Sequence, residues 1–262
     1  MKPVWLWIHG WGMSPDVWGD PGVWLPEARH RLFSYEGCHT VDEMKERLRE
    51  IVCEESLQGG PVHVLGWSLG GMLALELAME TGLGENKERL PIGQAVLIGA
   101  SLRFVDERRE IGWPGRVIRR MRTQLTADPA GTLLRFADSM LSPGERPTWP
   151  AVAERLAKRT DFTLAGLEAG LTYLLETDLT GRWERCSQAW AVEDVSEEIA
   201  MRDGAPEVIW MHGGEDPVCP PAALAVGPFR KTVLFPGAGH APFVTQPERF
   251  AQQLRRIADG YR

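Results

Sequence analysis

Gly66-Trp67-Ser68-Leu69-Gly70-Gly71 joins two apolar segments of different character, residues 61–65 and residues 72–80. The first is a short run with β-branched residues, which predicts a buried strand, and the second is rich in Ala and Leu, which predicts a helix. A serine between glycines at a strand-to-helix junction is typical of a nucleophile elbow, because the tight turn admits no large neighbour and holds the hydroxyl above the sheet. An ordinary glycine-rich turn is the alternative interpretation. We favour Ser68 as a nucleophile because both flanking elements are present.

Strand-like and helix-like segments alternate along much of the chain. Short apolar runs predict strands at residues 4–8, 61–65, 94–98, 208–211 and 232–235. Apolar residues at helical spacing predict helices at residues 40–57, 72–80 and 247–259. Thr40 and Glu43 stand at capping-box spacing at the start of the first of these helices. The alternation predicts an α/β fold with a mostly parallel sheet of about six strands flanked by helices.

Residues 102–186 interrupt this alternation. Helical patterns occur there at residues 116–124, 130–140, 149–159 and 163–175, without a convincing strand. We therefore predict a helical cap inserted between two strands of the sheet, with the core formed by residues 1–101 and 187–262.

A nucleophilic serine needs a base, and the base needs an orienting carboxylate. His240 lies in a glycine-rich loop after the fifth predicted strand, and Asp216 lies in the loop after the fourth. The chain order Ser68, Asp216, His240 is the one expected for this arrangement. Glu215 is the competing carboxylate, but a solvated loop charge is the better interpretation of it. The remaining histidines are expected to be structural or exposed, with His9 supporting its own loop by hydrogen bonds: His9, His30, His39, His63 and His212.

The loop after the first predicted strand, His9-Gly10-Trp11-Gly12, supplies the remaining part of the expected site. Its glycines let the backbone approach a substrate, so the N–H groups of Trp11 and Leu69 are the expected oxyanion-hole donors. This chemistry implies no metal ion and no organic cofactor. An apolar substrate slot is expected to include Trp11, Trp67, Phe104, Phe136, Met140 and Phe243.

Four motifs in this order resemble those of the α/β-hydrolase superfamily. They are HGWG at residues 9–12, GWSLGG at 66–71, GGEDPVCP at 213–220 and GAGHAPFVTQPERF at 237–250. The resemblance covers both ends of the chain and implies the α/β-hydrolase fold with Ser68, Asp216 and His240 as its catalytic triad. Many members begin with an antiparallel hairpin before the HG strand, whereas here that strand starts at Val4.

Within the superfamily the chain looks most like the BioH group, the pimeloyl-[acyl-carrier protein] methyl ester esterases of biotin synthesis. Residues 9–18, 66–71 and 177–179 carry this likeness. The two glycine motifs are closer together than is usual for the group. The resemblance implies a serine carboxylesterase whose ester is carried on an acidic protein, and hence a basic docking surface on the cap and an apolar slot for the acyl chain.

The distribution of charge bears on that expectation. The 262 residues include 29 Lys and Arg and 36 Asp and Glu, a net charge of −7, which argues against nucleic acid and anionic membranes as partners. Residues 102–186 nevertheless carry 14 basic and 12 acidic residues, so the cap is positive and the core negative. The arginines at helical spacing, which predict a docking face for an acyl-carrier protein, are Arg116, Arg119, Arg120, Arg155 and Arg159. A merely solvated cationic face is the alternative interpretation.

Other activities on the same fold remain open at this stage. They are a lyase or C–C hydrolase such as the menaquinone-pathway synthase of the superfamily, a general short-chain esterase, and a catalytically silent receptor. A basic pocket buried beneath the cap would favour the lyase. Four widely spaced cysteines, with neither a secretory signal nor an apolar run of spanning length, predict a cytoplasmic protein.

Overall fold

A computed structural model describes residues 2–80, 90–148, 156, 159–190, 205–227 and 231–260 of the chain. It contains one six-stranded sheet in the order β2-β1-β3-β4-β5-β6, in which every pairing is parallel. The strands are β1 (Val4–Ile8), β2 (Arg29–Leu32), β3 (Val62–Trp67), β4 (Ile92–Ile98), β5 (Glu207–Gly213) and β6 (Lys231–Phe235). The predicted α/β class and parallel sheet are confirmed.

The sequence predicts every strand of the sheet except β2, including β6 at the opposite edge. Every residue of β1 and β3 is buried, because helices cover both faces of the sheet. The edge strand β2 is absent from the sequence prediction, since three of its four residues, Arg-His-Arg-Leu, are polar and the last two are exposed. A strand of this kind is recognised only by its pairing, here with β1.

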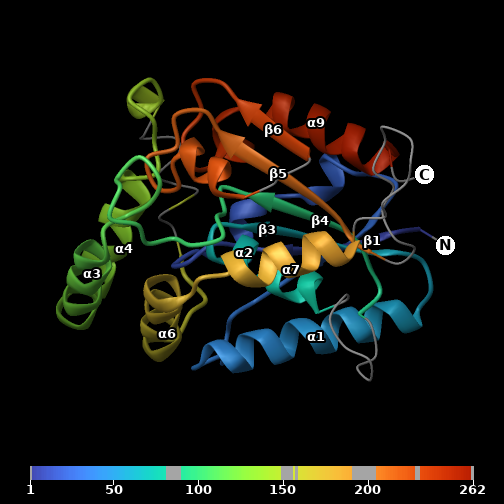
Figure 1. The fold of residues 1–262 in the computed structure, drawn as a ribbon, viewed down its shortest axis with the longest axis horizontal. Coiled ribbons are helices and arrows are strands. Elements are labelled where there is room, and N and C mark those ends of the chain that lie inside the picture. The colour runs from blue at the N-terminus through green and yellow to red at the C-terminus, as the bar shows by residue number, and fades with distance from the viewer. Residues whose placement is uncertain are drawn as a thin grey trace.

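Helices cover the two faces of the sheet (Figure 1). On one face lie α1 (Val41–Leu57), α2 (Leu69–Met79) and α7 (Thr180–Trp190), and on the other lies α9 (Pro247–Gly260), which follows the short helix α8 (Pro242–Thr245). The predicted capping box at the start of α1 is confirmed, because Thr40 and Glu43 each accept a hydrogen bond from the other's backbone N–H. Short 3-10 helices at Pro15–Trp18, Pro21–Val23, Arg146–Thr148 and Pro221–Val226 complete the described elements.

The insertion forms a helical layer at one end of the molecule (Figure 1). It contains α3 (Gly115–Ala127), α4 (Pro129–Asp138) and α6 (Leu164–Glu176), and α3 packs against both of the others. The predicted helix at residues 149–159 lies outside the described residues apart from Leu156 and Arg159. At the base of the insertion, Leu179 N–H donates to Leu102 O at 2.8 Å, after which α7 runs beside α2. We therefore group α7 with the core, although it begins within the predicted cap.

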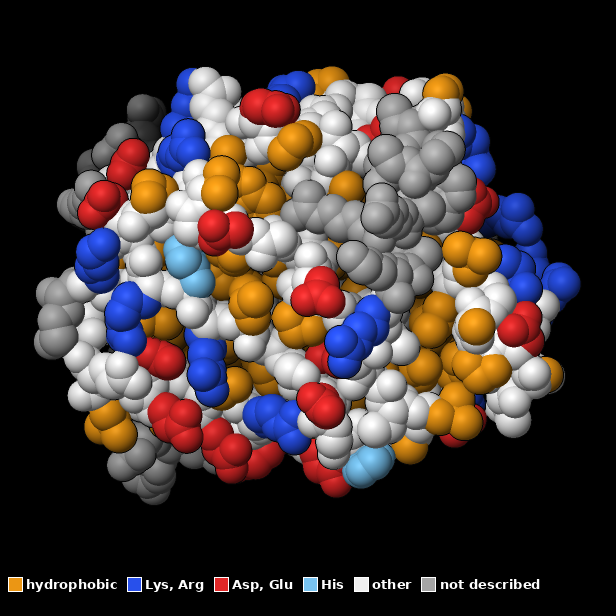
Figure 2. All heavy atoms as spheres, turned by 180° about the vertical axis from the view of Figure 1, so that it is seen from behind, with side chains coloured by type: hydrophobic (Ala, Val, Ile, Leu, Met, Phe, Trp, Pro, Cys, Tyr) orange, Lys and Arg blue, Asp and Glu red, His pale blue; other side chains and the backbone are white. Residues whose placement is uncertain are grey.

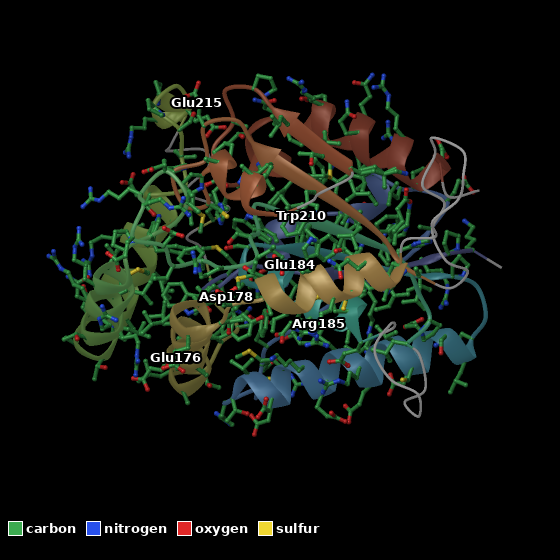
Figure 3. All side chains as sticks on the ribbon, in the orientation of Figure 1. Glu176, Asp178, Glu184, Arg185, Trp210 and Glu215 are labelled. Carbon is green, nitrogen blue, oxygen red and sulfur yellow. The ribbon has the colours of Figure 1, made fainter. Side chains whose placement is uncertain are left out.

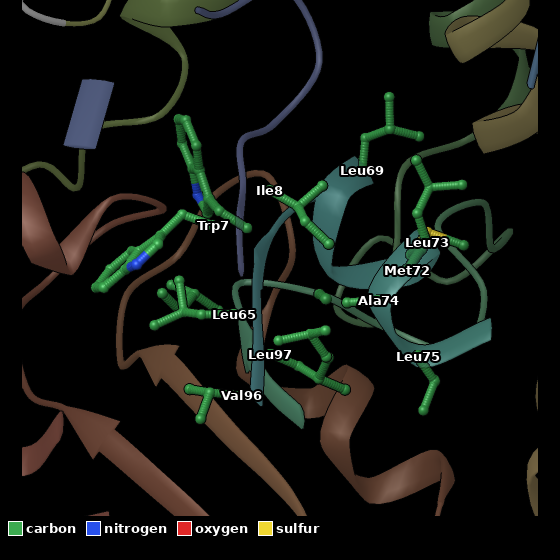
Figure 4. Close-up of a cluster of buried hydrophobic side chains, with 14 of the residues drawn as sticks. Trp7, Ile8, Leu65, Leu69, Met72, Leu73, Ala74, Leu75, Val96 and Leu97 are labelled. Atoms are coloured by element: carbon green, nitrogen blue, oxygen red, sulfur yellow. The ribbon is translucent and has the colours of Figure 1, made fainter. Parts of the chain in front are cut away.

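Helix α2 is the central element of the packing. All eleven of its residues are buried, and the helix packs on β1, β3 and β4, with Ala74 on the side that faces the sheet (Figure 4). Burial of one of its leucines contributes about 1.5–3 kcal/mol, so the helix holds its first residue firmly in place. That first residue, Leu69, directly follows Ser68.

One charged side chain of α2, Glu76, is also buried and ties the cap helix α6 to the core. Its carboxylate accepts hydrogen bonds from Tyr173 Oη at 2.7 Å and pairs with Lys45 Nζ at 2.7 Å. Arg182 adds a longer contact at 3.4 Å. Burial and the neighbouring carboxylate raise the pKa of the Tyr173 hydroxyl well above its usual value, so it remains a hydrogen-bond donor. Among the described helices, none is both long and apolar enough to cross a membrane.

Candidate active site

Ser68 occupies a strained turn between β3 and α2. Its φ of 57° and ψ of −120° make it the one residue other than glycine with positive φ in the described part of the chain. A side chain at Gly66 would collide with the backbone of Gly70, and one at Gly70 would collide with the backbone of Ile8. Backbone strain of this kind costs about 1–3 kcal/mol and persists only where the surrounding packing enforces it. The glycines of the motif are therefore required by close backbone contacts.

His240 and Asp216 form a buried pair beside this turn. Nδ1 of His240 lies 2.7 Å from Oδ2 of Asp216, and both side chains are fully buried. The other carboxylate oxygen accepts the backbone N–H groups of Val218 and Cys219, each at 2.8 Å. The carboxylate is thus held by its own loop and fixes the imidazole through Nδ1. Nε2 of His240 is buried and has no hydrogen-bond partner among the described residues, which leaves it available as a base.

Ser68 and His240 lie at the carboxyl ends of two neighbouring strands: Ser68 follows β3, and His240 lies against Gly99, which follows β4. Ser68 N–H donates to Ile98 O at 2.8 Å, and a side chain on Gly99 would lie 2.9 Å from Nδ1 of His240. Trp67 Nε1–H donates to the backbone carbonyl of His240 at 2.8 Å. The serine hydroxyl does not hydrogen-bond to Nε2 in this structure; such catalytic bonds commonly form only once a substrate is bound.

A second buried histidine, His212, lies next to the same carboxylate. Its Nε2 contacts Cys219 O and lies 3.7 Å from Oδ2 of Asp216. Burial lowers the pKa of His212, and it outweighs the attraction of Asp216 that acts to raise it. His212 therefore stays neutral at pH 7 and does not compete with His240 for the negative charge. Glu215, the other carboxylate considered from the sequence, precedes Asp216 in the loop after β5, and its side chain is exposed (Figure 3).

The two expected oxyanion-hole donors are the backbone N–H groups of Leu69 and Trp11. Leu69 is the first residue of α2, so its N–H has no intrahelical acceptor. Trp11 lies in the loop after β1, and this loop runs against the serine, because a side chain at Gly10 would lie 3.2 Å from Cβ of Ser68. The indole of Trp11 points into the cap, where Nε1–H donates to Leu167 O at 2.8 Å. The cap thus contacts the residue whose amide is the expected donor.

A cluster of polar side chains contacts the loop of His9 and Trp11. Nε2 of His9 lies 3.3 Å from Oδ1 of Asp161, and Tyr35 Oη donates to the carbonyl of His9 at 3.1 Å. Asp161 also accepts hydrogen bonds from Ser34 Oγ at 2.7 Å and from Tyr35 N–H at 2.9 Å. Burial acts to raise the pKa of the Asp161 carboxyl, but the bonds from these groups outweigh it and the pKa is lowered. Asp161 therefore supports the loop that carries His9 and Trp11.

The aromatic residues expected to line a slot fall into two groups. Phe136 packs edge-on against Trp11 with ring centroids 5.1 Å apart, and Trp113 joins Phe136 to Phe104. These rings form an aromatic cluster that connects the loop of Trp11 to the cap. Trp67 and Phe243 pack on each other, with centroids 5.0 Å apart, in the aromatic cluster of the core behind His240. Met140 is buried, and its carbonyl accepts the N–H of His240 at 2.8 Å.

The cap arginines differ in their surroundings. Arg116, Arg119 and Arg120 are exposed on α3, and within the described residues none has a carboxylate within ion-pair distance. Arg159 is exposed as well, and Arg155 lies outside the described residues. Figure 2 shows both charge signs interspersed over the back of the molecule, with blue side chains at the end that carries the cap and also over the core. No group of His, Cys, Asp and Glu in the described ranges could hold a metal ion.

Comparison with known proteins identifies relatives of this chain by sequence and by fold. The model of the alpha/beta hydrolase family matches residues 5–253. A pimeloyl-[acyl-carrier protein] methyl ester esterase of Aromatoleum aromaticum is 30% identical over 99% of both chains. The esterase of the same name from Vibrio cholerae is 26% identical over 96% of this chain and 92% of its own.

Solved structures show the same fold at lower identity. An esterase from Exiguobacterium antarcticum superposes with a TM-score of 0.72 at 18% identity, covering 99% of this chain and 92% of its own. An enol-lactonase from Burkholderia xenovorans superposes with a TM-score of 0.73 at 12% identity over 99% and 92%.

Proposed function

The chain belongs to the alpha/beta hydrolase family, and from that premise we propose that it is a serine carboxylesterase acting through an acyl-enzyme. The observation that carries the proposal is the buried His240–Asp216 pair. Nε2 of His240 has no hydrogen-bond partner among the described residues, and it lies at the carboxyl end of the strands, where the strained Ser68 also lies. A nucleophile, a base and an orienting carboxylate are the three groups that ester hydrolysis by this route requires.

The first half of the reaction transfers the acyl group to the enzyme. Oγ of Ser68 attacks the ester carbonyl carbon while Nε2 of His240 takes the hydroxyl proton. The negative oxygen of the tetrahedral intermediate accepts hydrogen bonds from the N–H groups of Trp11 and Leu69, and loss of one such donor typically costs about 2.7–4 kcal/mol of transition-state stabilisation. His240 then gives its proton to the departing alkoxide, and the alcohol leaves.

The second half consumes water. Nε2 of His240 takes a proton from a water molecule, whose oxygen attacks the acyl-Ser68 carbonyl. Collapse of this intermediate releases the carboxylic acid and returns the proton to Oγ of Ser68. Throughout, Asp216 holds the imidazole in one tautomer and stabilises its cation, so the chemistry needs only the ester and water.

For the substrate, we propose the methyl ester of a pimeloyl group carried on an acyl-carrier protein, an intermediate of biotin synthesis. The relatives of this chain that share 26–30% identity carry that activity in their names. The arginines of α3 support a docking role, because among the described residues they have no carboxylate partner, whereas four other cap arginines do. The paired arginines are Arg103, Arg108, Arg135 and Arg146. An exposed guanidinium without an internal partner is free to bind a carboxylate or phosphate of another protein.

Two further observations bear on the alternatives. A lyase acting on a carbon acid would be favoured by a basic pocket beneath the cap, but the α3 arginines are exposed on its outer surface. The four cysteines, Cys38, Cys53, Cys186 and Cys219, are all free, which agrees with the proposed cytoplasmic location.

The nucleophile is tested by Ser68→Ala on a short p-nitrophenyl ester. The variant should lose hydrolysis and labelling by a fluorophosphonate while its melting temperature stays near that of the wild type. Turnover close to wild type in Ser68→Ala would refute the serine mechanism.

Docking is tested by the double reversal Arg119→Glu with Arg120→Glu. We expect a loss of kcat/KM on the pimeloyl methyl ester bound to acyl-carrier protein, with activity on the p-nitrophenyl ester retained. A matched control is Arg31→Glu with Arg256→Glu, because both residues are exposed arginines on the core and the change in charge is the same. Equal losses on both substrates, or an equal effect of the control, would refute carrier docking at α3.

A further inference from the structure

The segment that follows α4 lies against the loop that carries His240. Met140 O accepts the N–H of His240 at 2.8 Å, and Ser142 Oγ donates to Gly237 O at 2.8 Å. Oε2 of Glu145 accepts the N–H of Gly239 at 2.9 Å and the N–H of Ser142 at 3.0 Å. Three hydrogen bonds therefore connect the cap to the loop of His240. The carboxylate of Glu145 makes one of them and, through the N–H of Ser142, also fixes the conformation of the cap segment.

The fit at this contact is close. A side chain on Gly239 would collide with Met140 O and would lie 2.7 Å from Oε2 of Glu145 and from Ser142 N. On its other side, Gly239 leaves no room for a side chain at Gly213, at the end of β5. The residue before the histidine is thus confined between the cap and the strand that leads to Asp216.

We infer that Glu145 is a positioning residue for the general base, acting through the backbone of Gly239. The inference rests on the proposed function, in which His240 is that base. Asp216 fixes the imidazole only at Nδ1, so the position of Nε2 depends also on the backbone at residues 239–240. The N–H of Gly239 would lose its acceptor without Glu145, and an orphaned buried donor costs about 1–3 kcal/mol, which favours reorientation of the loop.

The effect on turnover follows from geometry. A displacement of about 1 Å at a reacting group costs about 100-fold in rate. Glu145→Ala should therefore lower kcat on a short p-nitrophenyl ester by about 10- to 100-fold, with KM changed by less than about twofold, because the residue orients the base and does not bind substrate. Glu145→Gln keeps an oxygen acceptor for Gly239 and should recover most of the lost kcat.

Two controls separate positioning from a general loosening of the cap. Asp138→Ala removes a carboxylate near the same segment that, among the described residues, pairs only with Arg146, at 3.5 Å. This variant should keep kcat within about twofold of wild type. The proton on Nδ1 of His240, bonded to Asp216, should give a downfield resonance in the proton NMR spectrum. That resonance should shift or broaden in Glu145→Ala and stay in place in Asp138→Ala.

An unchanged kcat and an unchanged resonance in Glu145→Ala would overturn the inference, as would an equal loss in Asp138→Ala or no recovery in Glu145→Gln. Should Glu145→Ala fail to fold, Glu145→Asp keeps the charge but shortens the side chain that reaches the N–H of Gly239, so it should lower kcat several-fold; wild-type kcat in that variant would overturn the inference. Absence of Ser68-dependent hydrolysis in the wild type would refute the proposed function instead.

Discussion

Gly170 on α6 lies where the cap meets both expected oxyanion donors. A side chain added at Gly170 would lie 2.7 Å from Cδ1 and 3.2 Å from Nε1 of Trp11, and 3.3 Å from Cδ2 of Leu69. Carbon atoms in good contact are about 3.5–4.0 Å apart, so Gly170→Ala requires a local shift of about 1 Å. Trp11 cannot easily supply that shift alone, because its indole is held by Leu167 and packed on Phe136.

Two energies oppose each other in this substitution. Overpacking typically costs about 1–3 kcal/mol, whereas Ala is favoured over Gly in a helix by about 0.8–1.0 kcal/mol. The net loss of stability for Gly170→Ala should therefore be at most about 2 kcal/mol. The kcat of Gly170→Ala should fall by about 10- to 100-fold, because Trp11, which must move, carries an expected oxyanion donor.

Gly166→Ala on the same helix is the matched control. Its added side chain would lie 2.6 Å from Cys38 O, a comparable collision that does not involve the proposed catalytic groups. Melting temperature and the kcat for a short p-nitrophenyl ester should be measured for both variants. Similar stability losses with a large kcat loss only in Gly170→Ala support the assignment of Trp11 and Leu69. Wild-type kcat in Gly170→Ala, or equal kcat losses in the two variants, would refute it.

Two other predictions concern buried polar groups. Asp161→Asn should lower kcat about tenfold with little change in KM, because hydrogen bonds to a charged group contribute about 1.5–3 kcal/mol and these bonds support the loop of His9 and Trp11. Asp178→Asn, at the exposed ion pair with Arg103, is its control, and equal kcat values in the two variants would contradict the reasoning. Burial lowers the pKa of His63 to about 4, so the folded state binds fewer protons than the unfolded state between about pH 6.5 and 4. The free energy of unfolding should consequently fall by up to about 3 kcal/mol as the pH drops through that range, and urea titrations should find a smaller fall in His63→Leu.

The sequence predicted most strands of the sheet and the sharp turn at Ser68 well, because both depend on local signals. The elbow around Ser68 needs glycines for steric reasons that are visible in six consecutive residues, and buried central strands are continuous apolar runs. The edge strand β2 was missed because Arg-His-Arg-Leu has neither an apolar run nor alternation. Local pattern is thus sufficient where the packing demands of one short segment determine its composition.

The contacts that position the site are not local, and the sequence did not reveal them. Asp161 is 152 residues from His9, and Glu145 is 94 residues from Gly239. In the sequence, each carboxylate is indistinguishable from the other charged residues of the helical cap, because no neighbouring residue indicates that it accepts a distant hydrogen bond. The same holds for Trp67, whose place beside the serine suggested a substrate contact but whose indole supports the backbone of His240.

These distant contacts change what the cap does in the proposed reaction. Glu145 reaches the loop of the base, Asp161 reaches the loop of one oxyanion donor, and α6 packs on both donor residues through Gly170. A cap that swung away as a rigid lid would break all three contacts at once and leave an ordered nucleophile beside a disordered base and oxyanion hole. In the proposed reaction, turnover therefore requires the cap in place, because it helps to position both the base and the oxyanion donors.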